Sequence, residues 1–219
     1  GRINKWSIDF NADGLWNDSY SAQDTQEQVT DGNSGNPDRK VTTVDTKKND
    51  LYAAKLIASH PVAKGNLSFG AEYSYNNRNT TYFNEEGVLA NDKAQIKEGA
   101  ASAFVQYGRK FKKVNVQAGV RYENVDFDYY NAGRYVKEQS KIYNNVFPSI
   151  TLSFPVKKVQ MQLSYASDIN RPSYGQLGTN TTYANRKTKE KGNPFLMPSV
   201  SNNLTFGASY KWINIYLAY

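Results

Sequence analysis

Residues 114–122 of this 219-residue chain read VNVQAGVRY, a run in which apolar and polar side chains alternate. Successive side chains of a β-strand point to opposite faces of a sheet, so this period of two predicts a strand with one apolar and one polar face. The run is about as long as a tilted strand must be to cross the hydrocarbon of a bilayer. It therefore predicts an amphipathic strand of membrane-spanning length.

The same alternation recurs from one end of the chain to the other, and no stretch of comparable length has helical spacing. The predicted fold class is therefore all-β. The pattern predicts nine strands, at roughly 4–16, 49–60, 65–78, 99–110, 112–130, 144–154, 157–170, 201–210 and 212–219.

The connections between these strands alternate in length. Tight turns are expected at 60–65, 109–113, 155–158 and 211–212, and long polar loops at 17–48, 79–98, 131–143 and 171–200. Consecutive antiparallel strands then place all the short turns at one end and all the long loops at the other. A Greek-key sandwich has no reason to segregate its loops, whereas outer membrane barrels do. The rhythm predicts an up-and-down antiparallel meander that is part of, or closes into, an outer membrane β-barrel.

The composition is compatible with this fold. The chain has no cysteine, which excludes a disulfide scaffold and a thiolate metal site. Its mean hydropathy is −0.72, and no apolar run is long enough for a membrane-spanning helix. A barrel wall has a hydrophilic average because its two faces alternate.

The net charge of +7 does not indicate nucleic-acid binding, because of where the charge lies. Basic side chains gather at the predicted short turns, where they would lie near lipid headgroups. A second basic cluster, at 186–191, is interpreted as a solvated loop surface. The turn residues are Lys64, Arg109, Lys110, Lys112, Lys113, Lys157, Lys158 and Lys211.

Tryptophan and tyrosine are expected at both edges of the bilayer, because their rings are apolar but carry one polar group that can reach water. Trp6, Tyr107 and Trp212 lie beside short turns, and Tyr20, Tyr75, Tyr122 and Tyr165 lie nearer the long loops.

The predicted strand 112–130 contains one irregularity. Its apolar positions are even-numbered through Tyr122 and odd-numbered at Val125, Phe127 and Tyr129. Either a β-bulge near Glu123 and Asn124 shifts the faces, or the strand leaves the membrane there and continues as a hairpin in water.

Three candidates for chemistry have simpler interpretations. His60 is the only histidine and lies at a turn, where a solvated side chain is expected. Asp126 and Asp128 share a strand face about 7 Å apart, a spacing that inverting glycosidases use, but the polar face of an external hairpin is the better interpretation. The run 31–38 offers oxygen ligands for calcium but lacks the EF-hand register, which favours a surface loop. We predict no catalytic residue, no metal site, no cofactor and no enzymatic activity.

Two motifs resemble a known family. Residues 168–174 read DINRPSY and residues 192–198 read GNPFLMP. This pair, separated by a long loop between two strands, is similar to a pattern in TonB-dependent receptor-like outer membrane proteins of the Bacteroidetes. The motifs and the hairpin rhythm together cover most of the chain.

The resemblance implies a transporter-type barrel, which has about 22 strands, so residues 1–219 are expected to be one segment of a larger wall without its plug domain. It implies localisation in the cell outer membrane, contact with outer membrane lipid, and nutrient uptake or ligand binding at the outer surface. It also implies a periplasmic energy-coupling protein as partner. The ligand class is left open among a small molecule, a glycan and a peptide.

The last residues, 213–219, alternate and end on Tyr219, like the terminal assembly signal of outer membrane barrels. A lipid-facing strand within a longer wall has the same pattern. The position of the two motifs favours the second interpretation.

Ligand contact is expected at the loop end of the barrel, through aromatic residues and one arginine in or next to the loops. Two alternatives stay open: a soluble carbohydrate-binding β-sandwich or small β-barrel, and a small outer membrane enzyme. The predicted ligand-contact residues are Tyr82, Phe83, Tyr129, Tyr130, Arg171, Tyr174 and Tyr183.

Overall fold

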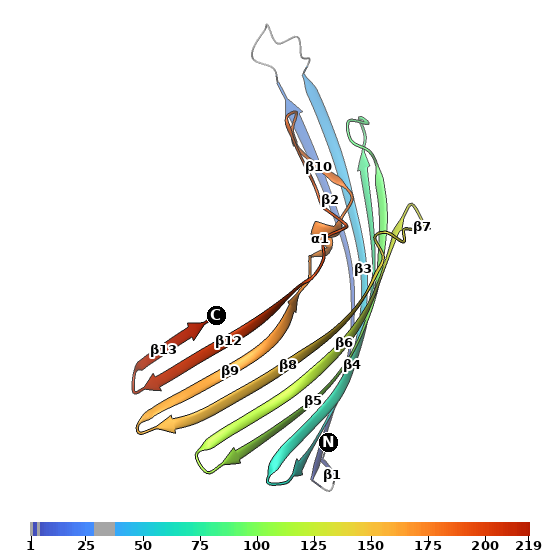
Figure 1. The fold of residues 1–219 in the computed structure, drawn as a ribbon. Helices are drawn as coiled ribbons and strands as arrows, with labels where there is room; N and C mark the ends of the chain where they lie inside the picture. The colour runs from blue at the N-terminus through green and yellow to red at the C-terminus, as the bar shows by residue number, and fades with distance from the viewer. Residues whose placement is uncertain (1, 4, 29–37) are drawn as a thin grey trace.

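The computed structural model describes residues 2–3, 5–28 and 38–219, and most of these residues form one strongly curved antiparallel sheet (Figure 1). Its strands follow chain order across the sheet, which confirms the predicted meander. They are β1 (Arg2–Ile3), β2 (Trp6–Glu27), β3 (Arg39–Val62), β4 (Gly65–Asn84), β5 (Asp92–Phe111), β6 (Val114–Asn131), β7 (Arg134–Tyr135, paired only with β6), β8 (Lys141–Val156), β9 (Val159–Asn170), β12 (Ser199–Tyr210) and β13 (Ile213–Ala218). The calcium candidate at 31–38 falls almost wholly outside the described residues.

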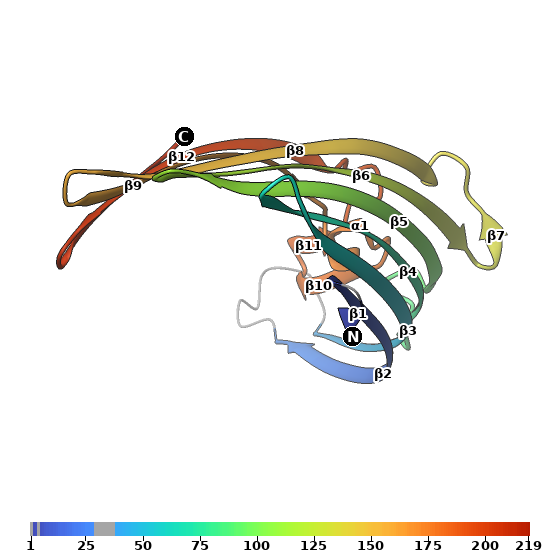
Figure 2. The same cartoon turned by 90° about the horizontal axis from the view of Figure 1, so that it is seen from below.

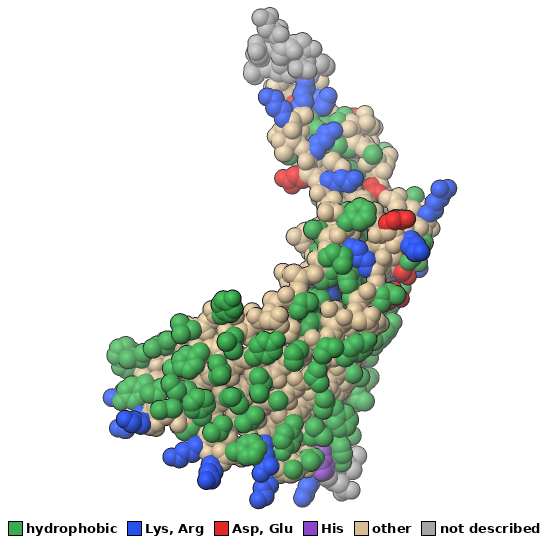
Figure 3. All heavy atoms as spheres, viewed as in Figure 1, with side chains coloured by type: hydrophobic (Ala, Val, Ile, Leu, Met, Phe, Trp, Pro, Cys, Tyr) green, Lys and Arg blue, Asp and Glu red, His purple; other side chains and the backbone are tan. Residues whose placement is uncertain are grey.

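The four predicted short turns lie together at one end of the sheet (Figure 1). Each contains a lysine with positive φ, at 61° for Lys64, 52° for Lys112, 56° for Lys157 and 53° for Lys211. Two-residue hairpins whose twist matches the strands require such left-handed residues. The basic turns therefore form one charged rim, at the lower edge of Figure 3.

The strands extend further than predicted. Residues 17–27, 39–48, 79–84 and 92–98 were expected to be loop, but they continue β2 to β5. The register is unbroken from Ser7 opposite Ser59 to Glu27 opposite Arg39. Above the bilayer neither face of the sheet meets lipid. Apolar side chains are needed only where another segment covers the sheet, as at Val41, Tyr82 and Ile96, so the strand ladder persists without the regular alternation that marks it lower down.

The two faces of the sheet differ in the half next to the short turns. The convex face carries a band of apolar side chains, for example Phe10, Leu56 and Phe69, which are 67%, 49% and 41% exposed (Figure 3). We call this surface, up to the level of Tyr73 and Tyr122, the apolar band. The concave face is polar there, with Lys55 Nζ 3.3 Å from Glu72 Oε2. A barrel wall needs this arrangement, with lipid outside and water inside.

The parity change in β6 is not a bulge. Pairing with β5 runs without a shift from Val114 opposite Phe111 to Asn131 opposite Ala94. The strand instead continues beyond the apolar band. Its apolar side chains change face there because a later segment of the chain covers the concave side. Phe127 and Tyr129 are buried there against Leu177, which belongs to another part of the chain.

The soluble-sandwich alternative is wrong. In the described part of the chain the only second sheet is the short hairpin of β10 (Thr181–Asn185) and β11 (Thr188–Lys191), and it lies on the concave side (Figure 2). The apolar band has no second layer over it. The sheet is open, since β13 pairs only with β12. Among the described residues, no helix has the length and apolar character needed to span a bilayer.

Candidate functional site on the concave face

Residues 171–198, expected to be a long outer loop, fold back over the concave face of the sheet (Figure 2). We call them the inner segment. It contains the single helical turn α1 (Tyr174–Leu177) and the hairpin β10–β11. Inside a barrel this position narrows the channel at the end opposite the short turns.

The serine of the first motif starts α1. Ser173 Oγ accepts from the backbone N–H of Gln176 at 3.3 Å, and the Ser173 N–H donates to Gln176 Oε1 at 2.8 Å. This reciprocal capping box satisfies N–H groups that a helix start leaves unpaired. It fixes a turn that redirects the chain from β9 onto the sheet.

The second motif closes against this turn. The N–H of Asn193 donates to the carbonyl oxygen of Gln176 at 2.6 Å. A Cβ added at Gly192 would lie 2.5 Å from the carbonyl oxygen of Gly178 and 2.6 Å from that of Gln176. Only glycine allows this approach, so close backbone contacts join the second motif to the residues that directly follow the first.

Arg171 holds the start of the inner segment through a buried acid. Glu123 on β6 is 3% exposed, and its carboxylate pairs with the guanidinium groups of both Arg121 and Arg171. Burial lowers the pKa of Arg171. The role of Glu123 is not visible in the sequence: the parity change of the strand lies beside it, but nothing in the local pattern indicates a buried acid that pairs with Arg171.

Tyr174 is held by groups from two strands. Its hydroxyl accepts from Asn76 Nδ2 at 2.7 Å and also bonds the Glu98 side chain, while the Arg78 guanidinium lies 5.4 Å from its ring centroid. Burial, and then the charge of Glu98, raises the pKa of Tyr174 to about 12. Burial also raises the pKa of Glu98. The phenol therefore stays neutral at physiological pH.

An apolar cluster secures the centre of the inner segment. Tyr129 is fully buried beside Leu177, Ile96 and Phe127. The hydroxyl of Tyr129 lies 2.8 Å from Thr179 Oγ1, and the Thr179 hydroxyl bonds the Asp92 carboxylate. Burial raises the pKa of Tyr129.

A second apolar cluster secures the hairpin β10–β11. Tyr183 and Tyr82, which are 2% and 4% exposed, pack with Val41 and Leu89. These contacts join the hairpin to β3 and β4.

Glu27, at the end of β2, also binds the hairpin. It accepts from Tyr183 Oη at 2.9 Å, from the Arg186 N–H at 2.6 Å and from Arg186 Nε at 3.1 Å. Desolvation raises the pKa of Glu27, but these hydrogen bonds outweigh it, so the pKa is lowered. Arg186 is therefore not the solvated residue that the sequence predicted, whereas the side chains of 187–191 are exposed.

The seven predicted ligand-contact residues divide between the two faces. Tyr82, Tyr129, Arg171, Tyr174 and Tyr183 gather on the concave side, where each is occupied in holding the inner segment. The other two, Phe83 and Tyr130, do not join them: by register they share the convex face with Tyr73 and Asp126. Contact of any of them with a ligand stays a prediction.

The inner segment also forms a polar cleft that the sequence did not indicate. It has a volume of about 380 Å³ and lies between α1 and the hairpin. A carboxylate, an ammonium group and side-chain amides face it, so it suits a small polar ligand rather than an apolar one. Its lining residues are Ser173, Gly175, Gln176, Asn180, Thr182, Glu190, Lys191 and Gly192.

An outer membrane protein beta-barrel family matches residues 3–219, nearly the whole chain. This chain belongs to that family. The cell outer membrane is therefore its location, as the strand pattern predicted. Among curated proteins, none matches the chain in sequence.

Solved structures with the same fold are outer membrane receptors and transporters. The ferripyoverdine receptor of Pseudomonas aeruginosa bound to ferripyoverdine has a TM-score of 0.64 at 12% identity, over 99% of this chain and 30% of that one. The copper transporter OprC has a TM-score of 0.60 at 12% identity, over 95% of this chain and 35% of that one. The ferric citrate transporter FecA in the unliganded form has a TM-score of 0.59 at 12% identity, over 93% of this chain and 30% of that one.

This chain thus spans about a third of the length of these proteins. The predicted likeness to TonB-dependent receptor barrels is confirmed at the level of the fold. The Bacteroidetes origin stays a prediction.

Proposed function

We propose that residues 1–219 form part of the wall of a larger outer membrane receptor that takes up a small polar nutrient. The observation that carries this proposal is the inner segment, which places a polar cleft on the water-facing side of the wall. A free surface loop does not need the ion pair between the buried Glu123 and Arg171, or the fully buried Tyr129, that hold this segment in position.

The open sheet supports the idea of a larger barrel. Isolated edge strands expose unpaired backbone groups, which are unfavourable in lipid, so the wall must be completed by further strands or by another chain. The fold neighbours, which are about three times longer, include receptors for a metal chelate and a transporter for copper. We accordingly propose a plug domain elsewhere in the protein and a periplasmic energy-coupling partner. The proposed role is uptake without chemical change of the ligand.

Uptake measurements in a strain lacking the full-length gene test the proposal. The strain, with and without the restored gene, is supplied with ferric chelates, copper, oligosaccharides and peptides as limiting nutrients. We expect one class to require the gene. Loss of that uptake when the periplasmic coupling protein is deleted supports energy coupling, and gene-dependent uptake that persists contradicts it.

The polar cleft has a matched control for its own role. The variant Glu190→Ala/Lys191→Ala removes the two charged groups of the cleft. The variant Lys137→Ala/Glu138→Ala removes an exposed pair in the 131–140 turn region. We expect uptake of the nutrient to fall about tenfold in the first variant and to stay unchanged in the second. Equal uptake of the nutrient by the two variants would mean that the cleft does not bind it.

A further inference from the structure

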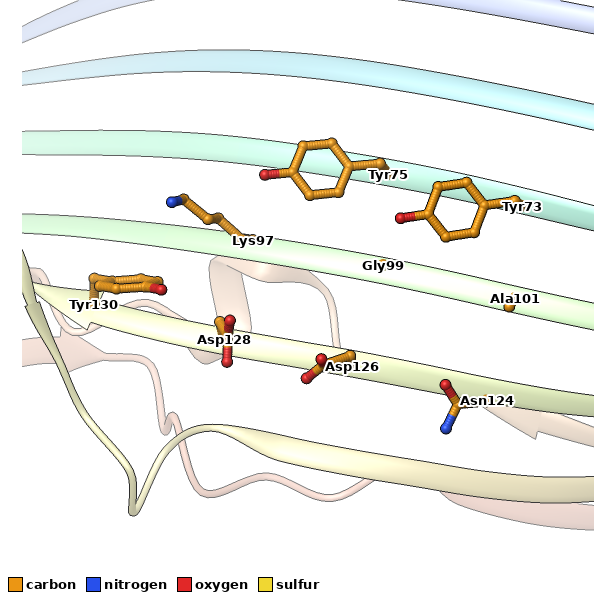
Figure 4. A pocket seen from close by; sticks show the side chains of 9 residues that line it. All are labelled: Tyr73, Tyr75, Lys97, Gly99, Ala101, Asn124, Asp126, Asp128 and Tyr130. Atoms are coloured by element: carbon orange, nitrogen blue, oxygen red, sulfur yellow. The ribbon is translucent and has the colours of Figure 1, made fainter.

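The convex face carries a groove of about 490 Å³ on the other side of the wall from the inner segment (Figure 4). It runs along β5, where Gly99 and Ala101 leave the floor open. Tyr73 and Tyr75 of β4 stand on one side of β5, and β6 contributes the other side, including Asp126 and Asp128 (Figure 4).

The register of three strands builds this groove. Gly99 pairs with Tyr75 on one side and with Asp126 on the other, so a residue without a side chain separates a ring from a carboxylate. Phe127 and Tyr129 are buried on the concave face. Because side chains alternate along β6, these two residues force Asp126 and Asp128 to the convex face.

The polar groups of the groove are available for a ligand. In the described part of the chain, neither Asp126 nor Asp128 has an ion pair or a side-chain hydrogen bond. Lys97 Nζ lies 5.0 Å from the centroid of the Tyr130 ring, a cation–π contact, and it makes no ion pair with any residue that the structure describes. Tyr73 is 54% exposed. Carboxylates, an ammonium group and tyrosine faces therefore converge on one open surface.

The level of the groove on the wall indicates what faces it. It begins at Tyr73, where the apolar band ends, and continues away from the short turns to Tyr130. In an outer membrane barrel the short turns are periplasmic, so this level meets the headgroups of the outer leaflet. The strands β4 to β6 are flanked by β3 and β8 in the same sheet, so the groove lies inside the wall and not at an open edge.

We propose that this groove binds the sugar headgroup of a glycolipid in the outer leaflet. Vicinal hydroxyls of a sugar donate well to a carboxylate, and charged acceptors make the stronger hydrogen bonds. Tyrosine offers an apolar face for the C–H side of a sugar ring and a hydroxyl at its rim. Two carboxylates against one ammonium group leave a formal charge of −1, which disfavours recognition of the headgroup through its phosphates.

This proposal goes beyond uptake and does not depend on it, because it uses the opposite face of the wall. Uptake by way of the concave face and lipid binding on the convex face can each fail without the other.

Binding of a defined glycolipid to the full-length protein tests the proposal. The protein is purified in mild detergent and titrated with rough lipopolysaccharide, and bound copies are counted by native mass spectrometry. The variant Gly99→Trp fills the groove, and a Cβ at Gly99 meets only the Tyr73 hydroxyl, at 3.4 Å. The variant Asp126→Asn/Asp128→Asn keeps the shape of the groove and removes its charge. We expect both to weaken glycolipid binding at least fivefold.

The controls separate this site from nonspecific binding. Glu85→Gln/Glu138→Gln removes the same charge from exposed turn residues outside the groove and is expected to bind as the wild type does. Dephosphorylated glycolipid is expected to bind like the intact lipid, and the deacylated oligosaccharide more weakly. The proposal is overturned if both groove variants bind the glycolipid with wild-type affinity. It is also overturned if the dephosphorylated glycolipid no longer binds, or if the deacylated oligosaccharide binds as tightly as the intact glycolipid. Folding of each variant is checked by heat-modifiable mobility on gels.

Discussion

At the scale of single residues, the hydroxyl of Tyr174 ties the inner segment to two strands of the sheet. It bridges Asn76 on β4 and Glu98 on β5. The change Tyr174→Phe removes both hydrogen bonds and leaves the Asn76 amide without this partner, at a cost of about 1 kcal/mol. We expect amide hydrogen exchange of α1 to become about fivefold faster. Tyr216→Phe, at a position 69% exposed on the last strand, is the control and is expected to leave exchange in α1 unchanged.

The raised pKa of Tyr174 predicts a dependence on pH. Its ordinary value is 10, and its value in the folded protein is about 12. A raised pKa means that the folded state favours the neutral phenol, so this stabilisation is complete below pH 10 and lost as the pH rises towards 12. Phenylalanine does not titrate, so we expect the free energy of unfolding of the wild type to fall relative to that of Tyr174→Phe across this window, until the variant is the more stable of the two. A constant difference between them would contradict the assigned pKa.

At the scale of elements, the hairpin β10–β11 is held by a residue 159 positions earlier in the chain. Glu27 accepts three hydrogen bonds from Tyr183 and Arg186. Glu27→Ala removes all three, so we expect faster amide exchange throughout 181–191 and little change in β3 and β4. Asp24→Ala, at an exposed residue of the same strand, is the matched control. Protection of the hairpin that survives Glu27→Ala would mean that the Tyr82–Tyr183 cluster alone holds it.

At the scale of the whole molecule, the two faces of the wall predict opposite tolerance to charge. Val105 on β5 lies in the apolar band between Phe69 and Val120, so Val105→Lys places an ammonium group in lipid. We expect a cost of about 2–4 kcal/mol, as for lysine near the midplane of other barrels. The cost is measured as urea unfolding of the full-length protein in lipid vesicles.

The same strand supplies the control. Ser102 faces the concave side between Glu72 and Glu123, so a new ammonium group there lies on the polar, water-facing side of the wall. Ser102→Lys is therefore expected to cost less than about 1 kcal/mol. If the two lysine variants were equally destabilised, the assignment of the convex face to lipid would be wrong.

The strands of this wall, their lipid-facing side and the end with the short turns can be predicted from the sequence. The alternation in 65–78 and 112–122 identifies strands and their lipid face, because the period of two is a property of the local chain. Lysines in tight turns mark the short-turn end for a similarly local reason. Even the parity change at Val125 is visible, although two explanations fit it until the register of β6 shows that there is no bulge.

The contacts that build the candidate sites cannot be predicted from the sequence. Glu123, Glu98 and Glu27 look like ordinary strand acids until the fold places them beside Arg171, Tyr174 and Arg186. Asn76 and Tyr174 are 98 residues apart in the chain. No local pattern encodes such a pair, since the signal lies in two segments that meet only when the loop folds inward.

The amino-acid sequence by itself thus determined the strand order, the two faces and the membrane location, because lipid and water act on each strand separately through its own alternation. Only the tertiary structure decided where the strands stop, that residues 171–198 line the inside, and that Asp126 shares an outer groove with Tyr75. Beyond the bilayer no face of a strand meets lipid, so the regular alternation fades. Contacts between distant segments, such as Tyr129 with Leu177, then determine the structure.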